Sequence, residues 1–109
     1  AAIYAAVQEL IATMMKENGI VPADIGAVIF PATADITAAF PAAGARQLQD
    51  FQLVPLFDAR QMEGPGSLSR CIRALMLVDT DKSQRDIRHV YLGRAAHLRP
   101  DLATPGTVT

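Results

Sequence analysis

The sequence predicts a single α+β domain, and three observations carry this prediction. A helical periodicity fills the first 18 residues, several short apolar runs rich in β-branched side chains follow, and turn-forming residues separate those runs. An order of helix first and strands afterwards is typical of the α+β class. The length of 109 residues fits one domain, because single cores usually span about 50 to 200 residues.

The N-terminal segment predicts an amphipathic helix from Ala2 to about Asn18. Its apolar side chains recur at the spacings of one helix face: Ile3, Val7, Leu10, Ile11, Met14 and Met15. Gly19 provides a helix stop, and Val21 and Pro22 begin the connection that follows.

The next stretch predicts two strands with a short helix between them. Residues 25–30 are rich in β-branched side chains and form the first strand, whereas residues 31–37 form a loop. Residues 41–48 form a short helix, because the proline that opens them suits a first helical turn. Residues 52–57 form the second strand, in which Pro55 indicates a sheet edge or a bulge.

The second half of the chain predicts shorter elements. Residues 63–67 are a turn of glycine, proline and polar residues, and residues 71–78 form an apolar, buried strand. Residues 83–86 form one short helical turn, and residues 90–92 and 95–98 form two more strands. This half therefore completes the sheet.

Composition and charge exclude several classes of protein. The formal net charge of -1 and the pI near 6.1 argue against a nucleic-acid binder. No apolar run approaches the roughly 20 residues that span a bilayer, and no secretory signal is evident. The single cysteine, Cys71, is expected to be a small buried hydrophobe, and it fits a reducing, cytoplasmic compartment. Residues 103–109 predict a flexible C-terminal tail.

Arg73 is the residue that most strongly indicates chemistry. It interrupts the apolar run of residues 71–78, and a guanidinium keeps its charge at any ordinary pH. Burying that charge without an anionic partner is costly. The position therefore indicates a paired carboxylate or an anionic ligand, and the alternative is an arginine at a sheet edge or a subunit contact.

Four segments carry a resemblance to a known family. They are Phe-Pro-Ala-Ala at residues 40–43, Arg-Cys-Ile-Arg at 70–73, Asp-Ile-Arg-His-Val-Tyr-Leu at 86–92 and Leu-Arg-Pro-Asp-Leu at 98–102. Together they resemble the trimeric α/β chorismate mutases, and the likeness covers residues 1–102 as one domain. It implies a pseudo α/β barrel built as a homotrimer, with a mixed sheet, one long N-terminal helix and sites at the subunit interfaces. It also implies an isomerase of aromatic amino-acid biosynthesis that needs no cofactor and no metal.

The reaction that the resemblance implies is the pericyclic rearrangement of chorismate to prephenate. One C–O bond breaks as one C–C bond forms, so the protein helps by orienting the substrate and by placing positive charge beside the ether oxygen. Arg73 falls on the family's position for that charge. Tyr91 falls on a pocket tyrosine whose hydroxyl donates to a substrate carboxylate; the alternative is an aromatic residue on a core strand.

Three further residues match pocket positions of the family, each with a structural alternative. Phe40 matches an aromatic residue that an adjacent subunit contributes, or it staples the helix that follows it. Arg46 matches a basic residue near the pocket mouth, or it is a solvated surface arginine. Arg99 matches a second basic residue, or it supports a turn of the chain.

The sequence also departs from the family pattern. Gln61 replaces a glutamate that hydrogen-bonds the ring hydroxyl, Asp58 replaces a cysteine, and Ala43 replaces a lysine, while Arg60 adds a charge. Asp58 is either a carboxylate relocated within the pocket or a surface residue. The sequence as given starts at the helix, without the family's first strand and the arginine that strand supplies; it is either a shortened form of the chain or one in which the strand has been lost.

These departures predict a chorismate mutase of reduced efficiency. One alternative is a diverged enzyme that acts on a chorismate-like dicarboxylate in a secondary pathway. The other is a non-catalytic, ligand-binding trimer.

Overall fold

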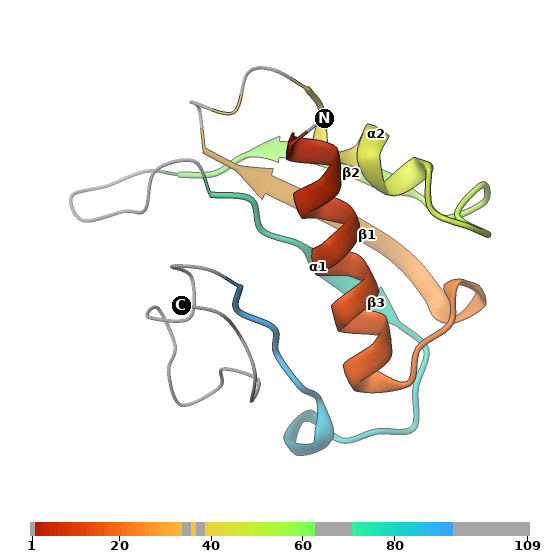
Figure 1. Cartoon of the computed structure of the whole chain (residues 1–109). Helices are drawn as coiled ribbons and strands as arrows, with labels where there is room; N and C mark the ends of the chain where they lie inside the picture. Colours follow the sequence, from red (N-terminus) through yellow and green to blue (C-terminus); the bar gives the residue numbers. More distant parts are fainter. Residues whose placement is uncertain (1, 34–35, 37–38, 63–70, 93–109) are drawn as a thin grey trace.

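The computed structural model describes residues 2–33, 36, 39–62 and 71–92 of the chain. Figure 1 shows how its elements are arranged. In chain order they are α1 (Ala2–Asn18), the 3-10 turn η1 (Pro22–Asp24), β1 (Ile25–Ala32), α2 (Pro41–Arg46), β2 (Leu56–Arg60), β3 (Leu75–Val78) and the 3-10 turn η2 (Gln84–Asp86). The predicted α+β class is confirmed.

One mixed sheet holds the three strands in the order β2–β1–β3. β1 runs parallel to β2, with Ile29 opposite Phe57, and antiparallel to β3, with Ile29 opposite Leu75. An isolated bridge between Ala32 and Ile72 continues the second pairing beyond β3. Three side chains from three strands therefore form a row on one face of the sheet.

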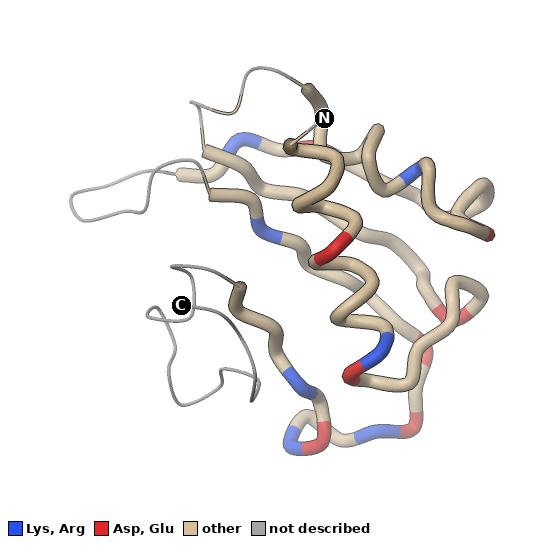
Figure 2. The backbone as a smooth tube through the Cα atoms, in the orientation of Figure 1, with Lys and Arg blue, Asp and Glu red and all other residues tan. Residues whose placement is uncertain are grey.

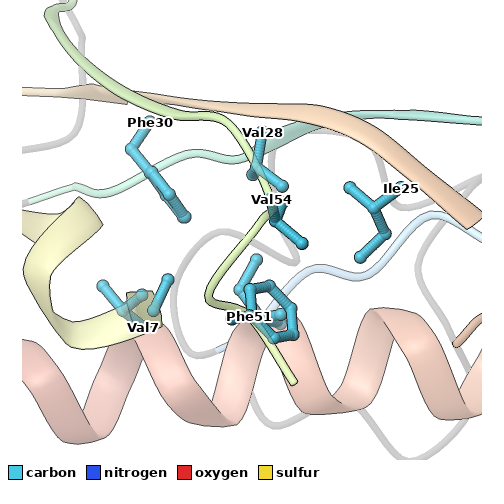
Figure 3. Packing of buried hydrophobic residues seen from close by; sticks show 8 residues of the cluster. Val7, Ile25, Val28, Phe30, Phe51 and Val54 are labelled. Carbon is cyan, nitrogen blue, oxygen red and sulfur yellow. The ribbon is translucent and has the colours of Figure 1, made fainter. Parts of the chain in front are cut away.

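Both helices pack on the other face, and the core lies between the two layers (Figure 1). Figure 3 shows side chains from α1, from the loop after α2 and from β1 meeting in this core. The buried cluster consists of Val7, Ile11, Ile25, Val28, Phe30, Ala45, Phe51 and Val54. Full burial of one such large apolar side chain contributes roughly 1.5–3 kcal/mol.

The long helix begins and ends as the sequence predicts. Val7 and Ile11 on its apolar face are fully buried, and Gly19 ends it with a φ of 63°. A side chain would strain that left-handed backbone. Gly44 of α2 allows a close approach of the two helices, since a Cβ there would lie 3.0 Å from the Cα of Tyr4.

The predicted boundaries of the first two strands are wrong. β1 continues through Pro31, which the sequence places in a loop, because the carbonyl of Pro31 accepts a hydrogen bond from the backbone N–H of Arg73 at 2.8 Å. β2 begins at Leu56 and not at residue 52, and the carbonyl of Pro55 accepts from the N–H of Val28 at 3.0 Å. Proline therefore contributes its acceptor to the ladder at both places without needing a donor.

The remaining predictions are met in part. The short helix ends at Arg46 rather than at residue 48, and the turn at residues 84–86 is confirmed. The third strand is regular only from Leu75 to Val78. Residues 90–92 lie in no strand, and residues 63–67 and 95–98 and the tail lie outside the described residues. Among the described residues, no helix combines the length and the apolar character needed to cross a membrane.

Asp50 has a φ of 66°, a left-handed backbone that costs a residue with a Cβ roughly 1–2 kcal/mol. Replacing this exposed residue with glycine is expected to raise the free energy of unfolding by about 0.5 to 1 kcal/mol, after the entropy cost of glycine is subtracted. Chemical denaturation of Asp50→Gly measures the change. Asp50→Ala keeps the strained Cβ and serves as the control; a glycine variant no more stable than it would contradict the prediction.

Candidate functional site

Arg73 lies just before β3, and its side chain is exposed. Burial alternates from residue 71 to residue 78, so Arg73 shares the exposed positions with Leu75 and Leu77. The predicted buried strand is therefore wrong for the single chain. Within the described residues, the Arg73 guanidinium has no salt bridge and no hydrogen bond. A paired carboxylate in this part of the chain does not account for Arg73.

An apolar sheet face that neither α1 nor α2 covers borders Arg73. Phe57, Ile29 and Leu75 form its central row, and Phe57 and Leu75 are 63% and 55% exposed. Leu77 adds a further side chain that is 52% exposed. Large contiguous apolar patches on a monomer usually mark a contact with another molecule. Arg73 therefore stands at the edge of a surface suited to burial by another protein surface.

A cleft lies between α1, β3 and residues 84–92, and Arg73 borders it as well. Its volume is about 1340 Å³, and Met14 of α1 and Tyr91 line it. This volume exceeds the roughly 300–1,000 Å³ of most small-ligand pockets, so the cleft has room for a ligand and for additional protein. The structure thus places Arg73 and the half-buried Tyr91 on one cavity.

Gln61 follows β2 directly and is a buried polar residue. Gln61 is 8% exposed, and its Oε1 atom has no hydrogen-bond partner among the residues that the structure describes. A buried polar atom left unpaired costs about 1–3 kcal/mol and is rare, so this acceptor points to a donor from a ligand or another chain.

Gln61 and Arg73 flank the same end of β1. The backbone N–H of Gln61 donates to Ala32 at 2.9 Å, and that of Arg73 donates to Pro31 at 2.8 Å. Their backbones are therefore two strand spacings apart, about 10 Å. This distance is compatible with two contacts to one small ligand.

Asp58 and Phe40 lie around the start of α2. The Oδ1 atom of Asp58 accepts a hydrogen bond from the backbone N–H of Ala42 at 2.8 Å, so this carboxylate ties β2 to α2. Phe40 precedes the helix with 72% of its surface exposed. Phe40 therefore does not staple α2 by packing against it.

Of the three remaining basic residues that the sequence singles out, the structure describes Arg46 and Arg60. Arg46 donates from Nη1 to the carbonyls of Phe51 and Gln52, at 2.6 and 3.1 Å, so it holds the loop after α2. Arg60 is exposed at the end of β2. Arg99 lies outside the described residues.

Two expectations about metals and thiols bear on the chemistry. The predicted burial of Cys71 is confirmed, with 8% of its surface exposed. In the part of the chain that the structure describes, no group of three His, Cys, Asp or Glu side chains is placed to hold a metal ion.

Sequence reasoning missed Asn18 and its partners. The Asn18 side chain hydrogen-bonds both backbone groups of Arg88, 70 residues further along the chain. A polar residue at the end of an amphipathic helix was the available signal, but its partner follows only from the tertiary fold.

Comparisons with known proteins match nearly the whole chain. A family model described as chorismate mutase type I matches residues 1–102. The chain is 50% identical over 102 residues to Chorismate mutase AroH of Thermus thermophilus, covering 93% of this chain and 83% of that protein. It is 41% identical over 96 residues to Chorismate mutase AroH of Bacillus subtilis, covering 88% and 76%. The solved structure of a chorismate mutase from Clostridium thermocellum aligns with a TM-score of 0.82 at 42% identity, covering 87% and 84%.

Proposed function

Because the chain belongs to the chorismate mutase type I family, we propose that it converts chorismate to prephenate at a site built around Arg73. The chain is therefore an isomerase, in agreement with the resemblance of its sequence. The observation that carries the site is the position of Arg73, a permanent cation without a partner among the described residues. It stands between an apolar face that α1 and α2 leave uncovered and a cleft that it shares with Tyr91.

Arg73 stabilises the transition state in this proposal. The C–O bond of the enolpyruvyl ether lengthens before the new C–C bond is complete, and negative charge grows on the ether oxygen. A fixed guanidinium beside that oxygen interacts more strongly with the transition state than with the substrate, and this difference accelerates the reaction. Because Arg73 is bound to no carboxylate of the described chain, its charge is available to the substrate.

Tyr91 and Gln61 orient the substrate. The hydroxyl of Tyr91 donates to a substrate carboxylate from the wall of the cleft, and the Oε1 atom of Gln61 accepts from the ring hydroxyl. The second contact would satisfy a buried acceptor that has no partner within the described part of the chain. Holding the flexible enolpyruvyl group over the ring removes orientational entropy before the reaction begins.

The remaining pocket residues act at the edges of the site. Arg46 and Arg99 add positive charge that attracts a dianion. Asp58 fixes the start of α2 through Ala42, and it thereby places the exposed Phe40.

The active form in this proposal is a homotrimer with a site at each subunit boundary. The row of Phe57, Ile29 and Leu75, in which Phe57 and Leu75 are exposed, supports it, because burying this face removes apolar surface from water and brings Arg73 into a cleft between two chains. Phe40 of the neighbouring subunit packs on the substrate. Desolvation at such a boundary strengthens the interaction of Arg73 with the ether oxygen.

Following chorismate loss by absorbance, with prephenate identified by proton NMR, tests the function. We expect prephenate as the single product, without any added metal or cofactor. Binding of chorismate by calorimetry without turnover would indicate a non-catalytic trimer. Turnover of a related dicarboxylate but not of chorismate would indicate a diverged enzyme, and either result would refute the proposal.

Replacing Gln61 with glutamate is expected to raise kcat/KM for chorismate about tenfold, because a hydrogen bond to a charged acceptor contributes roughly 1.5 kcal/mol or more. Steady-state kinetics on chorismate measure the change. Gln49→Glu adds the same charge at an exposed position outside the site and should leave kcat/KM unchanged. An unchanged kcat/KM in the Gln61 variant would place this residue outside the pocket.

A further inference from the structure

Asn18 joins two parts of the chain that are distant in sequence. It is the last residue of α1 and is 5% exposed. Its Nδ2 atom donates to the carbonyl of Arg88 at 2.9 Å, and its Oδ1 atom accepts from the N–H of Arg88 at 2.7 Å. Nδ2 also donates to the carbonyl of Met14 at 2.9 Å. Both polar atoms of the side-chain amide are therefore engaged.

The two hydrogen bonds between Asn18 and the backbone of Arg88 take the place of pairing with a neighbouring strand. Residues 87–92 belong to no strand of the described sheet, so no ladder fixes their position. The Asn18 amide offers Arg88 one donor and one acceptor side by side, which is what a neighbouring strand offers a residue of a ladder. The segment is thus held by a side chain where regular sheet pairing is absent.

A second contact supports the same junction. The Nζ atom of Lys82 donates to the backbone carbonyl of Asn18 at 2.6 Å, where cations interact favourably with the end of a helix. Figure 2 shows blue segments, which mark basic residues, in the connection around η2 near the C-terminal end of α1. The ion pair between Arg88 and Glu17 spans 3.9 Å between partly exposed groups, and such pairs contribute little.

We propose that Asn18 is a positioning residue of the enzyme: by holding both backbone groups of Arg88, it fixes where Tyr91 stands opposite Arg73. This inference rests on the proposed function, in which Tyr91 contacts the substrate. Tyr91 follows Arg88 by three residues, and both line the cleft between α1 and β3. A displacement of the segment at Arg88 therefore moves the tyrosine hydroxyl. Asn18 is 5% exposed and both polar atoms of its side chain are already engaged, so its role in this proposal is to position Tyr91 and not to bind the substrate.

Loss of the Asn18 amide has a kinetic signature that loss of stability does not share. A less stable protein has fewer active molecules, which lowers the apparent kcat and leaves KM unchanged. A displaced Tyr91 weakens a contact to a substrate carboxylate, which raises KM. We expect Asn18→Ala to raise KM for chorismate about tenfold, the factor that corresponds to about 1.4 kcal/mol of binding free energy.

Two further variants make the comparison specific. Asn18→Asp keeps an oxygen that accepts from the Arg88 N–H but loses the donor, so its KM should lie between those of wild type and Asn18→Ala. Val7→Ala removes a fully buried side chain from the same helix, far from Arg88. It lowers stability, and its KM should remain that of wild type.

Hydrogen–deuterium exchange of residues 86–92, together with steady-state kinetics of the four proteins, tests the inference. We expect faster exchange at these amides in Asn18→Ala than in Val7→Ala, with the rise in KM confined to the Asn18 variants. An Asn18→Ala protein with wild-type exchange and a KM within twofold of wild type would overturn it. If Asn18→Ala does not fold, the same comparison is made with Asn18→Asp. A wild-type protein without turnover would refute the proposed function, while exchange would still decide whether Asn18 holds the segment.

Discussion

Replacing Arg73 with alanine is expected to lower kcat for chorismate by about 10²- to 10³-fold, the usual loss when one preorganised donor to a developing oxyanion is removed. The effect on folding should be small, because the side chain is exposed and bonds to no described residue. Steady-state kinetics of the variant measure the loss of kcat, and its thermal unfolding measures the effect on stability.

Two further variants show what the Arg73 side chain contributes to kcat. Arg73→Lys keeps the charge but loses the planar, multiply donating group, so its kcat should lie between those of wild type and the alanine variant. Arg85→Ala removes an exposed arginine from η2 and should leave kcat unchanged. An Arg73→Ala enzyme with nearly full kcat would remove this residue from the mechanism.

Introducing lysine at both Leu75 and Leu77 is expected to dissociate the proposed trimer and to lower activity at least about tenfold, because in that proposal a second subunit completes each site. The two side chains are about half exposed on the uncovered face, so the chain itself can hold the lysines in water. Burying two charges at a subunit boundary, in contrast, is strongly unfavourable. Analytical ultracentrifugation, with circular dichroism as a check on folding, measures the result.

Leu53→Lys is the matched control for this face. Leu53 is 94% exposed in the loop before β2, away from the row formed by Phe57, Ile29 and Leu75. Its replacement should change neither assembly nor activity. A doubly substituted protein that remains a fully active trimer would show that this face is not the interface, and a monomeric wild type with full activity would refute the proposed trimer.

The sequence predicted the helix better than the strands for a physical reason. The apolar positions of α1, from Ile3 to Met15, repeat over about three and a half turns, so the helix follows from this periodicity and its C-terminal end from Gly19. The strands are short, and their ends depend on partners distant in sequence. Pro31 and Pro55 enter the ladder through their carbonyls, and a local preference against proline in strands does not reveal this.

The candidate site could be predicted only in part for a related reason. The identity of Arg73 follows from its apolar surroundings and from the family motif, but its exposure does not, because an apolar run looks alike whether its own helix or another subunit covers it. The hydrogen bonds between Asn18 and Arg88 join residues 70 positions apart. The unpaired Oε1 atom of Gln61 likewise follows only from three-dimensional packing.

Complementation between two inactive variants tests most directly that the site combines Arg73 of one subunit with Phe40 of the next. Arg73→Ala and Phe40→Asp, each expected to be inactive alone, are expressed together in equal amounts with different affinity tags, and the mixed trimers are purified. In a cyclic trimer that contains both variants, one of the three boundaries carries both intact residues, so about a third of wild-type turnover should return in the purified mixed trimers. Mixed trimers no more active than either parent would contradict a site shared between subunits.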